Sequence, residues 1–140
     1  MTSHGVNFLP VLIAAVAGWI AGAVWYTALS KHWIAAVGLT AEQMAANRKR
    51  RFAWLPFVLV FVADLVMAWT LTGILWHFDM LNLKDGIIVG ALCWLGFVLT
   101  TLLSNNAFAM RSYRLTAIDG GHWLLVLAIM GAIIGGMGVK

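Results

Sequence analysis

An acidic side chain, Asp64, interrupts one of the long apolar stretches of this sequence. It follows Phe52, where the stretch begins, by 12 residues, which corresponds to about 18 Å of helix. A carboxylate at that depth in a bilayer costs about 2.5–3.5 kcal/mol on insertion scales, and such groups commonly serve a function. Two hypotheses remain open. Asp64 belongs to a proton or cation relay or a substrate site, or it is a protonated acid whose hydrogen bonds hold helices together.

Candidate partners for Asp64 lie in the next apolar stretch at a similar depth. At 100° per residue, several of its polar side chains share one face of a helix. This polar seam consists of Thr100, Thr101, Ser104 and Asn105. We expect it to face Asp64 and to complete a candidate intramembrane polar site. The neighbouring Asn106 points away from the seam and is expected to end the helix and meet water.

Other reactive residue types do not form a recognisable site. His77 and His122 are expected at opposite membrane faces, so they cannot share a ligand, and no cluster has the spacing of metal ligands. No nucleophile elbow, phosphate loop or Ser–His–Asp arrangement occurs in the sequence. The sequence therefore predicts no metal, no cofactor and no enzymatic activity.

The composition places these residues in a membrane. Apolar types make up 63% of the chain and charged types 10%, whereas a soluble domain has about a quarter charged residues. Four stretches reach the roughly 20 residues that cross a bilayer, and without water the backbone must bond to itself as helix. They cover residues 6–29, 52–78, 86–110 and 120–139. We predict an all-α membrane protein, a four-transmembrane-helix bundle forming one domain over residues 1–140.

Two capping signals refine these boundaries. Thr40 and Gln43 match a capping box, which predicts a short cytoplasmic helix between the first and second spans. Asp119 precedes two glycines at the start of the fourth span and is expected to be its N-cap. That assignment leaves His122 at the membrane boundary, where a histidine needs no special role.

Basic residues predict one orientation for the whole chain. Seven of the nine Lys and Arg residues lie in the first and third loops, against only Lys84 and Lys140 on the other side. Short basic loops stay in the cytoplasm, so both termini are expected outside. The run Arg48–Arg51 is interpreted as this topology signal rather than as a nucleic-acid site, because the aromatic residues sit in the spans.

Glycines at helical spacing predict close helix packing. Gly18 with Gly22, Gly86 with Gly90, and Gly131 with Gly135 mark three of the four spans. The sequence leaves open whether these faces serve the bundle or a dimer. If the chain dimerises, the charge bias predicts parallel copies, in contact through Gly18 and Gly22 or through Gly131 and Gly135.

Two parts of the chain resemble a known family. The first is Gly18–Tyr26, followed by Trp33 and Gly38-Leu39-Thr40; the second is Trp94–Thr101, then Asn105 and Ile118–His122. Together they are similar to the family named for domain of unknown function 1761. The resemblance implies a small bacterial multi-span protein of the cytoplasmic (inner) membrane with no assigned activity, and it supplies no catalytic residues.

A function follows from the buried acid and the polar seam. We expect a small transporter or channel component that acts as an oligomer, because four helices alone enclose little of a pathway. The alternative is an accessory or assembly subunit that packs against a larger membrane complex. In either case the lipid bilayer is the main surrounding partner and nucleic acid is not one.

Overall fold

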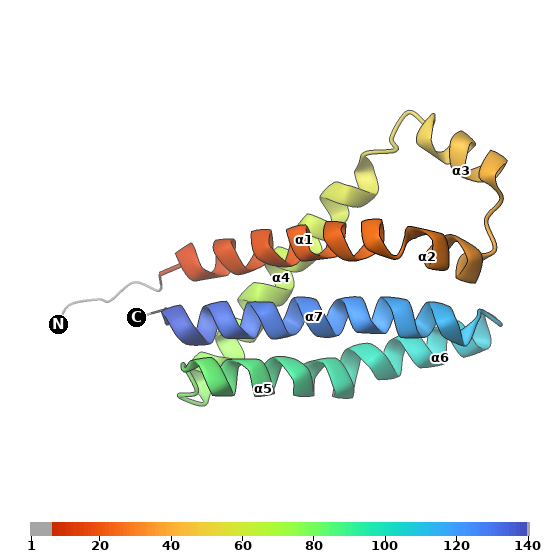
Figure 1. Cartoon of the computed structure of the whole chain (residues 1–140). Coiled ribbons are helices and arrows are strands. Elements are labelled where there is room, and N and C mark those ends of the chain that lie inside the picture. Colours follow the sequence, from red (N-terminus) through yellow and green to blue (C-terminus); the bar gives the residue numbers. More distant parts are fainter. Residues whose placement is uncertain (1–6, 140) are drawn as a thin grey trace.

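The computed structural model describes residues 7–139, so Val6 and Lys140 lie outside the described part. Every regular element in that part is helical (Figure 1). The elements in chain order are α1 (Leu9–Ala28), α2 (Ser30–Val37), α3 (Ala41–Arg48), α4 (Leu55–His77), α5 (Leu83–Cys93), the π-helical η1 (Trp94–Leu99), α6 (Thr100–Phe108) and α7 (Tyr113–Met137). The segments α5, η1 and α6 follow one another without a break and form one long helix.

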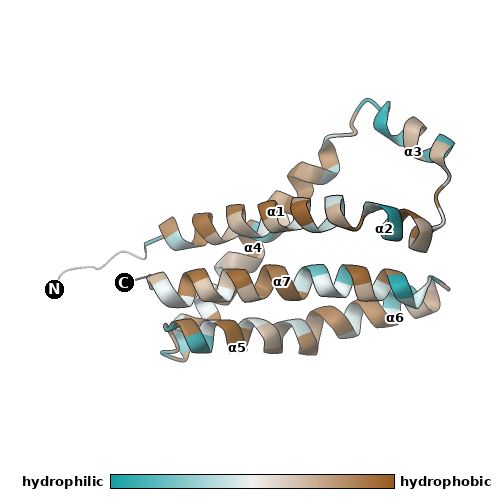
Figure 2. Cartoon of the chain, viewed as in Figure 1, coloured by the Kyte–Doolittle hydropathy of each residue, from teal (hydrophilic) through white to brown (hydrophobic). Residues whose placement is uncertain are grey.

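Within residues 7–139, four helices are long and apolar enough to cross a membrane: α1, α4, the continuous Leu83–Phe108 helix, and α7. This confirms the predicted all-α protein with four spans. Figure 2 shows hydrophobic residues along these helices and hydrophilic residues on α3 and near the helix ends. The first and last described residues lie at one end of the bundle, where the backbone N–H of Asn7 donates to the carbonyl of Val139 at 3.1 Å. We call the opposite end, with α2, α3 and the α6–α7 turn, the loop end.

The start of the fourth span differs from the prediction. Helix α7 begins at Tyr113, with Ser112 as its N-cap, and the Ser112 hydroxyl accepts from the backbone N–H of Arg114 at 3.1 Å. Asp119 therefore lies inside the helix, and its assignment as an N-cap was wrong. A helix begins where its first free N–H groups find acceptors, and this need not coincide with the start of the apolar run.

The predicted helix between the first two spans is present as α3. Its capping box is formed, since the Gln43 N–H donates to the Thr40 hydroxyl and the Gln43 side chain accepts from the Thr40 N–H. A second short helix, α2, was not predicted. It continues α1 beyond Leu29 (Figure 1), and its C-cap is Gly38, whose φ of 81° suits glycine. Among residues 7–139, α3 packs against no other element.

Helix α7 is the centre of the bundle. It packs along α1 on one side and along α5 on the other, while α4 crosses obliquely and packs against α1, α5 and α7 (Figure 1). The largest fully buried apolar side chains come from α4 and α7: Leu75, Val126, Met130 and Ile134. The third span is the outermost helix, with only 11% of its most apolar window buried, so most of its surface is left to lipid or to another protein.

Glycines allow α5 and α7 to approach backbone to backbone. A methyl group on Gly86 would overlap the carbonyl of Gly131, and one on Gly131 would overlap the carbonyl of Gly86. Gly90 and Gly135 likewise come close to backbone carbonyls, those of Leu127 in α7 and of Asn82, the N-cap of α5. This pattern is the close small-residue packing typical of membrane helices.

Gly18 and Gly22 are covered as well, by side chains of α7: Val126 and Met130 meet Gly18, and His122 meets Gly22. Both glycine faces proposed for a dimer contact are therefore already filled by the helices of one chain. The expected contact through Gly18 and Gly22 or Gly131 and Gly135 is corrected accordingly. These faces belong to the bundle because α7 is flanked by glycine-bearing helices on both sides.

Candidate intramembrane polar site

Asp64 is buried near the middle of α4, with 1% of its surface exposed. It lies against α1, where a methyl group on Gly18 would come within 3.9 Å of the carboxyl carbon. Neither carboxyl oxygen has a hydrogen-bond partner among the described residues. A buried carboxyl group of this kind needs a compensating partner, which is a proton, a cation or a donor.

The polar seam does not lie beside Asp64. Helix α4 packs on α1, α5 and α7, whereas α6 packs on α7 and η1. Thr100, Thr101 and Ser104 are exposed, and each hydroxyl donates to the carbonyl four residues earlier in the same helix. Asn105 is exposed on the same helix. The expected grouping of Asp64 with these four residues is thus not formed within one chain, because α7 is the partner of both helices.

Asn106 makes a contact between helices instead of meeting water. Its side-chain amide donates to the hydroxyl of Thr116 at 3.0 Å, and Thr116 is buried in α7. The expectation that Asn106 faces water was wrong. Its place on the side of α6 opposite the seam turns it toward α7, where a buried hydroxyl needs a partner.

His122 is buried in α7, with 3% of its surface exposed. The earlier start of α7 moves it from the expected membrane boundary into the interior of the bundle. Its Nε2 lies 2.7 Å from where a methyl group on Gly22 would be, so the missing side chain of Gly22 provides the space for the imidazole. Its Nδ1 is buried and has no hydrogen-bond partner among the described residues.

Tyr26 connects His122 to an acid nearer the loop end. The ring centroids of Tyr26 and His122 are 4.9 Å apart, and the Tyr26 hydroxyl donates to Asp119 Oδ1 at 2.6 Å. Next to it, the Trp25 indole N–H donates to the carbonyl of Ile118 at 3.0 Å. These bonds fix the end of α1 against the first half of α7.

Four titratable side chains therefore follow one face of α1: Asp64 beside Gly18, His122 beside Gly22, then Tyr26 and Asp119. We call these four residues the polar file. Positions 18, 22 and 26 are successive turns of α1, about 6 Å apart along its axis. The file thus runs from the middle of the bundle toward the loop end. No described group of three or more His, Cys, Asp or Glu side chains could hold a metal ion.

The family model described as "Protein of unknown function (DUF1761)" matches residues 9–135. The chain belongs to this family. Neither a curated protein nor a solved structure matches the chain. Two of the segments that carried the resemblance, Gly18–Tyr26 and Ile118–His122, contact each other in the structure and supply three members of the polar file.

In this DUF1761 protein, the Tyr26–Asp119 hydrogen bond makes a first prediction. Tyr26→Phe should lower the free energy of unfolding by about 1–2 kcal/mol, because a partly buried carboxylate loses its donor. Unfolding in mixed micelles measures this effect. Tyr113→Phe is the matched control, since Tyr113 is 73% exposed, and it should be neutral. A double-mutant cycle with Asp119→Asn that shows no coupling would contradict the assignment.

Proposed function

We propose that this chain is a small proton-coupled transporter or channel component of the bacterial cytoplasmic membrane, acting as an oligomer. The observation that carries the proposal is the pair of buried, unpartnered groups: both oxygens of Asp64 and Nδ1 of His122. Ionisable side chains inside membrane proteins commonly mark ion or substrate pathways.

Proton transfer is the chemistry that the polar file supports best. Asp64 can carry one proton on its carboxyl group, and His122 can pass one between its two ring nitrogens. The two residues lie one turn of α1 apart, about 6 Å along the axis, so a bridging water or a side-chain rotation is needed between them. Tyr26 and Asp119 continue the file toward the loop end through their hydrogen bond.

Oligomerisation is supported by the exposed third span. Its polar seam of Thr100, Thr101, Ser104 and Asn105 faces outward from the chain. The hydroxyls are bonded to their own helix, whereas the exposed amide of Asn105 would be costly against lipid. A second copy packed on this face would shield the amide and add helices around a pathway.

In the proposed orientation the loop end lies in the cytoplasm and both termini lie outside, because basic loops stay inside. A prediction follows for single cysteines in a Cys93→Ala background. Glu42→Cys, in α3, should resist membrane-impermeant maleimide in intact cells, while Lys84→Cys, at the opposite end of the bundle, should react. Labelling of position 42 from outside would contradict this orientation and indicate the opposite one.

Reconstitution of the purified chain into vesicles tests the function. A pH-sensitive dye inside the vesicles should report a proton flux that the chain supports without other proteins. The alternative, an accessory or assembly subunit, would be supported if the vesicles show no flux and the chain co-purifies stoichiometrically with a larger membrane protein. That pair of results would contradict the proposal. The alternative draws on the same exposed third span, which a different protein could cover.

A further inference from the structure

We infer that the junction of α1, α2 and α7 at the loop end binds an anionic phospholipid, with its headgroup between α2 and α7 and one acyl chain along α1. The inference does not depend on transport. It rests on two adjoining cavities, one lined by basic residues and one apolar. The basic cavity lies at the loop end and the apolar cavity lies beside the span, as the headgroup and acyl chain of a lipid require.

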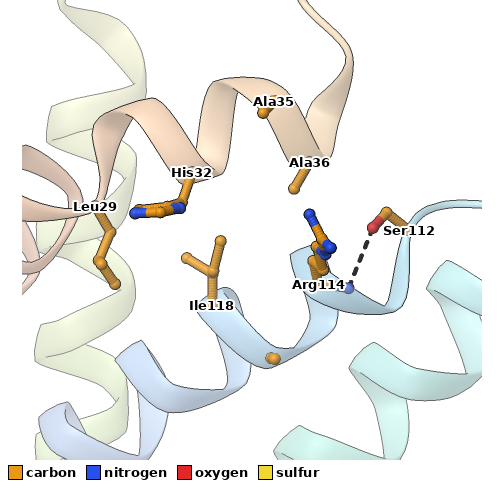
Figure 3. Close-up of a pocket in the computed structure, with 8 residues that line it drawn as sticks. Leu29, His32, Ala35, Ala36, Ser112, Arg114 and Ile118 are labelled. Carbon is orange, nitrogen blue, oxygen red and sulfur yellow. Dashed lines mark hydrogen bonds between the residues drawn. The ribbon is translucent and has the colours of Figure 1, made fainter.

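The first cavity lies between α2 and α7 and has a volume of about 620 Å³. Figure 3 shows His32 and Ala36 on the α2 side facing Arg114 and Ile118 on α7. None of the described residues that line this cavity is acidic. Among the described residues no carboxylate forms an ion pair with Arg114. In the hydrogen bond drawn in Figure 3 the backbone N–H of Arg114 donates to the Ser112 hydroxyl, so the guanidinium takes no part in it. The guanidinium is therefore free to bind a phosphate group.

The second cavity has a volume of about 540 Å³ and an almost wholly apolar lining. It extends along α1 and α7 over Ala21, Trp25, Ala28 and Leu125, and Leu29 lines both cavities. Arg114 of the first cavity and Leu125 of the second lie 11 residues apart on α7, or about 16 Å along its axis. Two cavities that meet at Leu29 and extend over that distance accommodate a headgroup and a large part of one acyl chain.

The depth of the two cavities identifies the source of the anion. The cationic cavity lies beyond Ala28, where the first span ends, and the apolar cavity lies beside the span itself. A phospholipid of the surrounding leaflet has its phosphate at the first level and its chains at the second. A free phosphate would use only the cationic cavity and would leave the apolar one without an occupant.

Native mass spectrometry of the delipidated chain, titrated with phosphatidylglycerol, tests the inference. We expect one retained lipid and about fivefold weaker binding for Arg114→Gln, since one basic residue contributes about 1 kcal/mol to anionic lipid binding. Arg50→Gln is the matched control, because Arg50 is exposed but lines neither cavity, and its affinity should match that of the wild type. Ala28→Trp, which fills the apolar cavity, should also weaken binding.

Three results would overturn the inference. Equal affinity of Arg114→Gln and Arg50→Gln for phosphatidylglycerol would show that the cationic cavity does not bind the headgroup. Equal binding of phosphatidylcholine and phosphatidylglycerol would remove the charge requirement. Displacement of the lipid by inorganic phosphate at comparable concentration would show that the site binds an anion and does not need an acyl chain. Size-exclusion profiles that match the wild type establish that each variant is folded.

Discussion

Asp64→Asn should abolish proton flux in reconstituted vesicles while the bundle stays folded. An amide has nearly the shape of a carboxyl group and can both donate and accept hydrogen bonds, but it cannot exchange the proton that a relay must carry. The substitution therefore separates the two hypotheses for this residue. Because neither oxygen of Asp64 has a partner among the described residues, the amide breaks no hydrogen bond of the folded chain.

Asp64→Glu is the matched variant, since it keeps an acid that can be protonated at the same helix position. Its extra methylene must fit beside Gly18, so we expect reduced but measurable flux and some loss of stability. Flux in the Asn variant equal to that of the wild type would defeat the relay. If the Asn variant unfolds more easily and the chain shows no flux in any form, Asp64 serves helix packing.

The sequence predicted the spans because their signal is local. Twenty apolar residues must form a helix in lipid wherever they pack, and the capping box at Thr40 and Gln43 requires only neighbours within one turn. The contacts of Asp64 are of another kind. Helical periodicity shows which residues share a face, as it did for the seam at Thr100, but it does not show which helix that face meets. Hence α6 was expected beside α4. In the structure the two helices do not contact each other, and each packs against α7.

The burial of His122 was missed because the predicted start of the helix lay seven residues too late. The Asp119-Gly120-Gly121 sequence is typical of a helix start, and the prediction stopped there, whereas Ser112 caps the helix. Moving the start to Tyr113 buries His122 and brings it against Gly22. The spacing of Gly18 and Gly22 was the available signal, because small residues on one helix leave room for a large side chain on the next. Which side chain fills that room is a tertiary property.

The α5–α7 contact predicts opposite effects for one substitution at two glycines. Gly86→Ala should destabilise the chain by about 3 kcal/mol or more, whereas Gly73→Ala should be neutral or stabilise it by up to about 1 kcal/mol. Both glycines lie inside helices, so the intrinsic gain in helix propensity is the same. They differ in what the new methyl group meets: the carbonyl of Gly131 at position 86, and open space at position 73.

The size of the effect at Gly86 follows from the rigidity of its neighbour. An overlap with a flexible side chain is relieved by a rotamer change, but an overlap with a backbone carbonyl requires two helices to separate. That separation would also loosen the contacts of Gly90 and Gly135, since all of these glycines lie on one α5–α7 interface. Gly131→Ala should therefore resemble Gly86→Ala, and the double variant should cost less than the sum, because one separation relieves both overlaps. Unfolding of the wild type and the four variants in mixed micelles measures the series. A Gly86→Ala variant as stable as Gly73→Ala would show that α5 and α7 do not meet at these glycines.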